Sequence, residues 1–431
     1  MIKAHTGTII SGVTFIEGGL GAVKGVCCAG VSAGFRRNPE RKDLALVVTG
    51  TPATAAGVFT QNAFCAAPVT VSRAHLQECA AGADDGVRAI VLNSGNANAA
   101  TGGPGHNTAL EVAQIAAQAL GCEPHQVLLA STGVIGVPLA VDGFVAGISQ
   151  ALEQLGSANG DDPAAGLAAA EAIMTTDTVP KQSAVTFTAT QSDGVQVTYT
   201  IGGMCKGSGM IQPDMATMLA VLATDAALTT EAANLALREA VASSFNKVTV
   251  DSDTSTNDSA FFLATGATPG KTINAACPVY SLFTAALRVL CEDLARQIAA
   301  DGEGATKLVT VNVTGAVTAA DANLAARAVA NSPLVKTAIA GHDANWGRIA
   351  MAIGKSGARF AQEDVGIAIM GIEVCEKGLT VPFDEDEALR RFAEHPEIVI
   401  DIDLGAGTSA TRIWTCDLTH DYISINGDYR S

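Results

Sequence analysis

The sequence has few aromatic residues, few positive charges and no long apolar run. Aromatic residues make up 4% of the chain, and 26 Lys and Arg are outnumbered by 43 Asp and Glu, giving a formal net charge of −17. Phosphate binding needs clustered Lys and Arg, so this balance argues against a nucleic-acid partner. No apolar run approaches the roughly 18–20 residues that span a bilayer, and residues 1–30 lack the unbroken apolar centre of a signal peptide. We therefore expect a cytoplasmic protein with no membrane partner.

The ten cysteines show no pattern that binds metal or builds a disulfide framework. None stands in a Cys-x-x-Cys pair, and the seven histidines are dispersed along the chain. A zinc site needs such ligands at close spacing. We therefore expect small, buried thiols in a reducing cytosol, and no metal site.

Short apolar runs with strand character alternate with alanine-rich stretches of helical character. Strands are predicted at Leu44–Val48, Ala89–Leu92, Lys307–Thr314 and Ile398–Ile402, a β-hairpin at Val185–Ile201, and helices at Ala109–Leu120, Pro163–Met174, Glu231–Ser243 and Tyr280–Ala300. In the last helix Arg288, Glu292 and Arg296 recur at helical spacing, and we interpret them as a solvated face. The pattern predicts a mixed α/β or α+β fold in one interlocked body.

The most informative stretch, KGSGMIQPDMATMLA, occupies residues 206–220. Gly203, Gly207 and Gly209 surround Lys206, which indicates a backbone that turns sharply or approaches a ligand closely. Thr217 stands at the start of an apolar run, where a buried hydroxyl needs a partner. Local chemistry alone is compatible with a structural turn, a ligand-binding loop or a nucleophile. It is not a Walker A loop, because the order G-x-x-x-x-G-K-[ST] is absent.

This stretch is very similar to the signature of the ornithine acetyltransferase family, the glutamate N-acetyltransferases of ArgJ type. Other segments resemble family landmarks in family order and span essentially the whole chain: NSGNANA at 93–99, STGVIG at 131–136, TTDT at 175–178, VDSDTSTND at 250–258, DGEGAT at 301–306, NWGR at 345–348 and INGDY at 425–429. Two departures are visible. Ala100 stands where the family usually has Cys, and Gly427 where it usually has Ala. Both exchange one small residue for another.

The resemblance implies an ArgJ/DmpA-like layered fold that processes itself. In the family the chain is cut before the motif threonine, which here is the bond between Ala216 and Thr217, and the freed threonine is the nucleophile. The expected products are an α chain of residues 1–216 and a β chain of residues 217–431. They are expected to form one interlocked body and to assemble as α₂β₂ heterotetramers or larger.

Further roles are carried over from the family by residue match. Thr132 and Gly133 are expected to form the oxyanion hole. The substrate-binding residues are expected to be Thr175, Thr176, Lys206, Thr217, Glu303, Asn426 and Ser431. The sequence does not decide between Thr175 and Thr176.

A threonine hydroxyl is a weak nucleophile and needs a base. Cleavage would supply one, because the new α-amine of Thr217 has a reference pKa of about 7.7–8 and can take the Oγ proton. The expected reaction moves an acetyl group from N-acetylornithine to glutamate by a ping-pong route that releases ornithine. No cofactor is expected, and the use of acetyl-CoA as a second acetyl donor stays open.

Two other functions stay open. One is a self-processing aminopeptidase or amidohydrolase of the related group, which uses Ser. The other is a binding protein that has lost catalysis. Thr217 and its spacing from Lys206 favour the transferase. Asp251, Asp253 and Asp258 lack the Gly and Glu of an EF-hand and are interpreted as turn and hydrogen-bonding residues.

Overall fold

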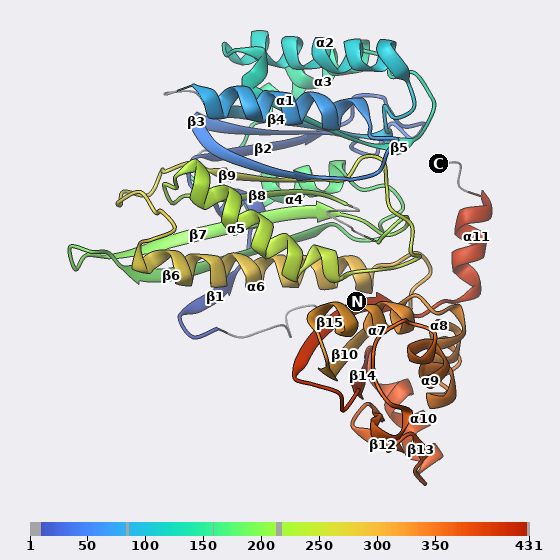
Figure 1. Ribbon diagram of the computed structural model, residues 1–431. Coiled ribbons are helices and arrows are strands. Elements are labelled where there is room, and N and C mark those ends of the chain that lie inside the picture. The colour runs from blue at the N-terminus through green and yellow to red at the C-terminus, as the bar shows by residue number, and fades with distance from the viewer. Residues whose placement is uncertain (1–9, 83–85, 158, 213–217, 429–431) are drawn as a thin grey trace.

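The computed structural model describes residues 10–82, 86–157, 159–212 and 218–428 (Figure 1). It contains two β-sheets, each covered by helices. The larger sheet has nine strands: β1 Val13–Ile16, β2 Val26–Val31, β3 Leu44–Phe59, β4 Val87–Asn96, β5 Val127–Val134, β6 Lys181–Thr190, β7 Gln196–Lys206, β8 Leu219–Thr224 and β9 Ser259–Ala264. Their order is β1-β6-β7-β8-β9-β3-β4-β5, with β2 paired to β3.

Strand β3 joins the two halves of the larger sheet. It pairs with β4 up to Ala53 and then with β9 over residues 54–59, and its register shifts between Val48 and Ala53. Ala45 and Val47 pack in one hydrophobic core. Leu44, Leu46 and Val48, on the other face of the strand, pack in another. Because both faces are buried, the strand reads as a continuous apolar run in the sequence.

The two halves of this sheet lie between layers of helices (Figure 1). The helices are α1 Ala67–Ala81, α2 Gly102–Leu120, α3 Asp142–Glu153, α4 Pro163–Ala172, α5 Thr230–Ser243 and α6 Pro278–Ala300. Helices α1, α2 and α3 share a core with β3, β4 and β5, whereas α5 and α6 share a core with β6 to β9. A third core, which includes residues of α4, lies between the two halves.

The larger sheet interleaves strands from the two sides of residue 216. β8 and β9 follow that residue in sequence, yet they lie between β7 and β3, which precede it. β8 is antiparallel to β7 and parallel to β9. The two parts of the chain are therefore hydrogen-bonded into one sheet.

The second sheet has six strands and its own core. Its strands are β10 Leu308–Ala316, β11 Gly366–Ile369, β12 Ile372–Glu376, β13 Leu379–Thr380, β14 Glu397–Asp403 and β15 Ser409–Cys416, in the order β13-β12-β11-β14-β10-β15. The accompanying helices are α7 Ala319–Ala330, α8 Pro333–Ala340, α9 Trp346–Gly354 and α10 Glu385–Glu394. We call residues 308–416 the six-stranded unit. Leu308, Trp414 and Cys416 from its edge also belong to the core of α5 and α6, which joins the two sheets.

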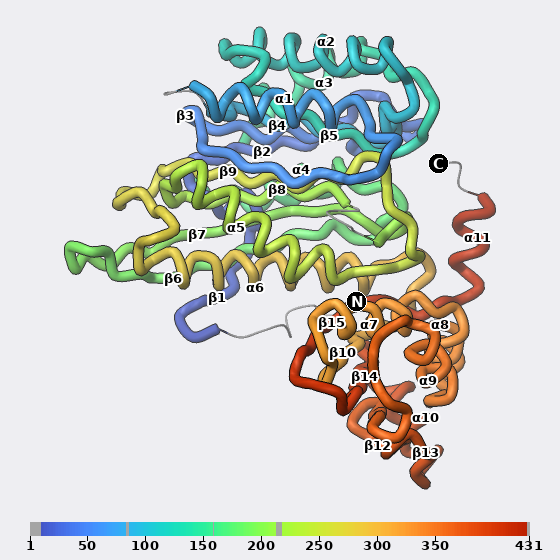
Figure 2. Tube along the Cα trace, viewed as in Figure 1, coloured from blue at the N-terminus to red at the C-terminus, as the bar shows by residue number. Residues whose placement is uncertain are grey.

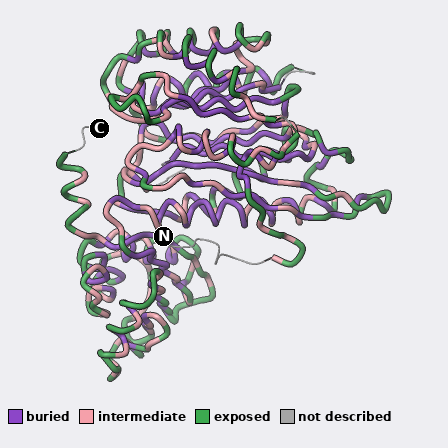
Figure 3. The backbone as a smooth tube through the Cα atoms, turned by 180° about the vertical axis from the view of Figure 1, so that it is seen from behind, coloured by how far each residue is buried: buried purple, intermediate pink, exposed green. Residues whose placement is uncertain are grey.

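The last helix, α11 His420–Asp428, leaves the six-stranded unit and runs back beside the larger one (Figure 2). It is mostly exposed, whereas the strands of the larger sheet are buried along most of their length (Figure 3). No helix in the described ranges is long and apolar enough to cross a membrane.

The predicted mixed α/β fold is confirmed, with differences in detail. The hairpin is formed by β6 and β7, and the four predicted helices correspond to α2, α4, α5 and α6. Residues 202–206, which show no clean period, continue strand β7. All ten cysteines lie in the described ranges and are free thiols.

The prediction of a solvated face on α6 is wrong for two of its three residues. Arg296 is 5% exposed and Glu292 is 9% exposed. The guanidinium of Arg296 donates two hydrogen bonds, of 3.0 and 2.9 Å, to the carboxylate of Glu397 in β14. This face of α6 is buried because the six-stranded unit packs against it.

Candidate active site

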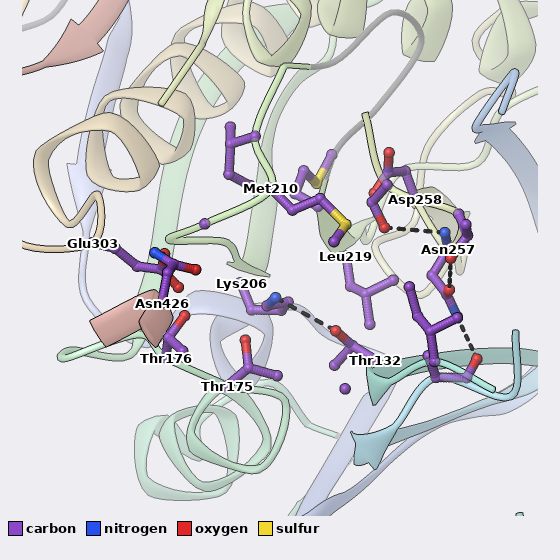
Figure 4. A pocket seen from close by; sticks show the side chains of 18 residues that line it. Thr132, Thr175, Thr176, Lys206, Met210, Leu219, Asn257, Asp258, Glu303 and Asn426 are labelled. Atoms are coloured by element: carbon purple, nitrogen blue, oxygen red, sulfur yellow. Dashed lines mark hydrogen bonds between the residues drawn. The ribbon is translucent and has the colours of Figure 1, made fainter. Parts of the chain in front are cut away.

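One pocket collects all the predicted site residues that the structure describes. It lies at the ends of β5 and β7, and Thr132, Gly133, Thr175, Thr176, Lys206, Glu303 and Asn426 line it (Figure 4). Ala216, Thr217 and Ser431 lie outside the described residues. Met218 and Leu219, which follow Thr217 in sequence, also line the pocket.

Thr132 and Gly133 lie near the C-terminal end of strand β5. The hydroxyl of Thr132 accepts a hydrogen bond of 3.5 Å from Nζ of Lys206, which leaves its own proton available for donation. Gly133 has φ of 131°, and a Cβ there would lie 2.3 Å from the carbonyl carbon of Gly95. The position therefore requires glycine, which explains the Gly in the STGVIG segment.

Lys206 ends strand β7 and is 7% exposed. Burial lowers the pKa of its ammonium group, while the neighbouring Asp177 acts in the opposite direction. A buried cation at the ends of two strands is suited to bind an anionic group of a ligand, because it provides an opposite charge in a poorly hydrated site.

Beneath Lys206 lies a buried ionic network of Asp177, Lys181 and Asp301. Nζ of Lys181 is 2.7 Å from Oδ1 of Asp177 and also contacts Asp301. Burial favours the neutral form of Asp177, but the charges of Lys181 and Lys206 outweigh it and hold the pKa of this carboxyl below its usual range. The carboxylate of Asp177 is therefore ionised at neutral pH.

This network connects three of the sequence landmarks. The carboxylate of Asp177 accepts hydrogen bonds from the backbone N–H of Gly207, at 2.7 Å, and of Thr175, at 2.8 Å. The hydroxyl of Ser208 donates to the carbonyl of Asp301 at 2.6 Å. The TTDT, KGSG and DGEG segments are thus fixed to one another below the pocket.

Glu303 and Asn426 form the opposite wall. The side-chain amide of Asn426, in α11, donates a hydrogen bond of 2.7 Å to Oε2 of Glu303. The backbone N–H of Glu303 donates to the carbonyl of Ser208 at 3.0 Å. A Cβ at Gly209 would lie 2.3 Å from the Glu303 carboxylate, so this glycine makes room for the acid.

The 250–258 segment forms the remaining wall. The side-chain amide of Asn257 donates to the carbonyls of Ala97 and Ser131, at 2.5 and 2.8 Å, and ties this segment to the end of β5. Asp258 is 2% exposed, and burial raises the pKa of its carboxyl well above the usual range. Asp251 accepts backbone hydrogen bonds from the glycine-rich loop, in agreement with its interpretation as a hydrogen-bonding residue.

Sequence reasoning missed the network of Asp177, Lys181 and Asp301 and the pocket-lining position of Asn257. Asp177 and Asp301 stand inside predicted landmark segments, which was a usable signal. Lys181 follows Asp177 by four residues in what reads as the start of a strand, and nothing in the sequence marks it as buried. Among the described residues, no group of three or more His, Cys, Asp or Glu could hold a metal ion.

Comparisons with known proteins give matches over most of the chain. The model of the ArgJ family matches residues 27–431. The arginine biosynthesis bifunctional protein ArgJ of Symbiobacterium thermophilum is 46% identical over 418 residues, which are 97% of this chain and 100% of that protein. A crystal structure of the protein of the same name from Bacillus halodurans is 44% identical, covers 49% of this chain and 100% of its own, and has a TM-score of 0.48.

A second solved structure is the ornithine acetyltransferase of Mycobacterium tuberculosis, complexed with ornithine. It is 35% identical, covers 48% of this chain and 99% of its own, and has a TM-score of 0.39. The family match and the curated relative extend over nearly the whole sequence, which confirms the resemblance seen in the motifs. This chain belongs to the ArgJ family.

Proposed function

We propose that this chain moves an acetyl group from N2-acetyl-L-ornithine to L-glutamate by way of an acetyl ester on Thr217. One observation carries the proposal: a single pocket gathers the predicted oxyanion donors, the predicted substrate-binding residues and Met218, the neighbour of the proposed nucleophile. These residues come from segments far apart in the sequence, so their convergence is not a consequence of chain proximity.

Self-processing is the first proposed step. The Oγ of Thr217 attacks the carbonyl carbon of Ala216, the C–N bond breaks, and the Oγ proton passes to the nitrogen. Water then hydrolyses the resulting ester, which leaves a carboxylate on Ala216 and a free hydroxyl and α-amine on Thr217. The two fragments, 1–216 and 217–431, would stay together because β8 and β9 are hydrogen-bonded between β7 and β3.

Acetyl transfer follows in two half-reactions. The α-amine of Thr217 takes the Oγ proton, Oγ attacks the acetyl carbonyl, and ornithine leaves with a proton on its amine. The amine of glutamate then attacks the acetyl ester and restores the hydroxyl. The hydroxyl of Thr132 and the N–H of Gly133 are proposed to stabilise each tetrahedral oxyanion.

Recognition of the amino-acid part of both substrates is assigned to the charged groups of the pocket. Lys206, which lines the pocket, is proposed to hold a substrate carboxylate, and Glu303 with Asn426 to receive a substrate ammonium. Thr175 and Thr176 line the pocket between these charges. N2-acetylornithine and glutamate share the α-carboxylate, so the Lys206 contact serves both. The α-nitrogen of N2-acetylornithine is acetylated, so the ammonium assigned to Glu303 is the one on its side chain.

The remaining expectations are part of the proposal. The enzyme would need no cofactor, would accept acetyl-CoA as a second donor if it is bifunctional, and would act in the cytoplasm as an α₂β₂ heterotetramer or larger assembly. A steady-state assay with acetyl-CoA and glutamate as the only substrates tests the second donor.

The covalent intermediate is the direct test of the reaction. Incubation with N2-acetylornithine alone should add one acetyl group to the 217–431 fragment and release one ornithine per site, and glutamate should then remove the acetyl group. Free acetate formed without glutamate, at the rate of transfer, would instead identify an amidohydrolase.

Thr132→Val is expected to lower kcat by about 10²–10³-fold with little change in KM, because it removes an oxyanion donor but keeps the side-chain volume. The measurement is steady-state transfer kinetics. Thr198→Val is the matched control, since Thr198 lies on the exposed hairpin and its hydroxyl contacts Thr188. An unchanged kcat would remove Thr132 from the oxyanion hole.

Gly209→Ala is expected to raise the KM for N2-acetylornithine about tenfold, a loss of about 1.4 kcal/mol of binding, with kcat and Tm nearly unchanged. The added Cβ would displace the Glu303 carboxylate, which is the far end of a flexible side chain and can move. Gly354→Ala is the control, because a Cβ there meets nothing within 4 Å. A large loss of Tm instead would show that Gly209 serves folding alone.

A further inference from the structure

The residues just before the proposed cleavage site are fixed by a dense set of hydrogen bonds. The carboxylate of Asp251 accepts from the backbone N–H groups of Met210, at 2.7 Å, and Ile211, at 2.8 Å. The N–H of Gln212 donates to the carbonyl of Asp253 at 2.8 Å. Gln212 is the last described residue before the proposed scissile bond and lies four positions ahead of Ala216 in the sequence.

The side chain of Gln212 belongs to a polar triad that reaches into the six-stranded unit. We call Gln212, Thr249 and Asn331 the Gln212 triad. The amide nitrogen of Asn331 donates to Oε1 of Gln212. The hydroxyl of Thr249 donates to Oδ1 of Asn331 at 2.6 Å and lies 3.4 Å from the same Gln212 oxygen. Thr249 is fully buried, whereas Gln212 and Asn331 are half-buried.

Asn331 directly follows α7, and the segment beside it is also held from the six-stranded unit. The N–H of Thr249 donates to the carbonyl of Trp414, in β15, at 2.9 Å. Nζ of Lys336, a residue of α8 that is 3% exposed, donates to the carbonyl of Val250 at 2.9 Å. The six-stranded unit therefore holds in place the segment to which residues 210–212 are hydrogen-bonded.

We infer that the six-stranded unit positions the chain for self-cleavage, and that Asn331 is a positioning residue acting through Gln212. The inference rests on the proposed self-processing. Attack of a hydroxyl on its neighbouring carbonyl needs reacting atoms about 3–3.5 Å apart and aligned, and a displacement of about 1 Å costs about 100-fold in rate. Acetyl transfer by the mature enzyme does not need the 216–217 bond, so the triad acts on maturation rather than turnover.

The test compares the rate of chain cleavage with the rate of acetyl transfer. Asn331→Ala is expected to slow cleavage about tenfold. Electrophoresis of samples taken during a cell-free translation reaction measures the rate of cleavage. Once fully cleaved, the same variant should have a kcat within about twofold of the wild type. Asn323→Ala, in the preceding helix α7, is the control, since Asn323 contacts Lys247 rather than Gln212.

A double variant of Gln212 and Asn331 distinguishes a positioning effect on cleavage from a general loss of stability. In a Gln212→Ala background, Asn331→Ala should slow cleavage no further, because the two side chains act through one contact. Asn331→Asp keeps the acceptor for Thr249 but loses the donor to Gln212, and should be cleaved slowly with an unchanged Tm. Normal cleavage of Asn331→Ala, or additive losses in the double variant, would overturn the inference. A wild-type chain that is never cleaved would overturn the proposed function instead.

Discussion

Thr217→Ala should yield a single uncut chain of 43.6 kDa with no measurable acetyl transfer. The substitution removes the hydroxyl that is proposed to attack the carbonyl of Ala216 during processing and the acetyl carbonyl of the donor during turnover. Loss of the nucleophile in an enzyme of this mechanistic kind lowers kcat by about 10⁶-fold, which is below detection in an ordinary transfer assay. Denaturing electrophoresis and the assay of ornithine release measure the two losses separately.

Thr217→Ser and Thr70→Ala are the matched controls for this result. Serine keeps a hydroxyl and an α-amine, so this variant should still be cleaved and retain part of its activity. Thr70 lies exposed on α1, and its hydroxyl bonds only within its helix at the carbonyl of Ala67. Full cleavage of Thr217→Ala would mean that another group breaks the chain.

Asp177→Asn should destabilise the protein by about 3–5 kcal/mol, because it removes one of the two carboxylates that compensate the buried charges of Lys181 and Lys206. Asp177 is 5% exposed and its carboxylate faces Lys181, at 2.7 Å, with Lys206 nearby. The free energy of unfolding, from urea titration, measures this loss. Activity should fall as well, because the same carboxylate holds the N–H groups of Thr175 and Gly207.

Asp193→Asn is the control for this variant. Asp193 also pairs with a lysine, Lys271, at 3.1 Å, but both side chains are exposed, so no measurable loss is expected. An equal loss of unfolding free energy in both variants would mean that the buried network stabilises the fold no more than an exposed ion pair does.

The same carboxyl predicts how stability depends on pH. The pKa of Asp177 is held below its usual range in the folded protein, so the folded state binds fewer protons than the unfolded state. This contribution is complete above about pH 4 and is lost as the pH falls below it. In Asp177→Asn the decline of stability on the acid side should therefore be shallower than in the wild type.

Much of the pocket lining follows from the sequence, because several of the landmarks contain a predicted site residue. STGVIG contains Thr132 and Gly133, and DGEGAT contains Glu303; both segments line the pocket. Parts of β3 and β4 were also predicted, since their apolar runs reflect burial on both faces. The alternating pattern of residues 185–201 predicted the hairpin of β6 and β7. Thr217 and Ser431 lie outside the described residues, and their roles stay predictions.

Long-range charge pairing could not be predicted, because sequence spacing does not reveal it. Lys181 and Asp301 meet across 120 positions, and Arg296 meets Glu397 across 101. Strand β3 was predicted to end at Val48, because Gly50 and Pro52 follow. The strand continues because the register shift accommodates these residues at an exposed site and transfers the pairing from β4 to β9.

Intact mass spectrometry of the purified, active wild-type protein tests the central claim most directly. The account predicts two fragments with the masses of residues 1–216 and 217–431, the second beginning with an unmodified threonine. An active preparation that consists of one unbroken chain, or a second fragment whose first amine is blocked, would contradict it.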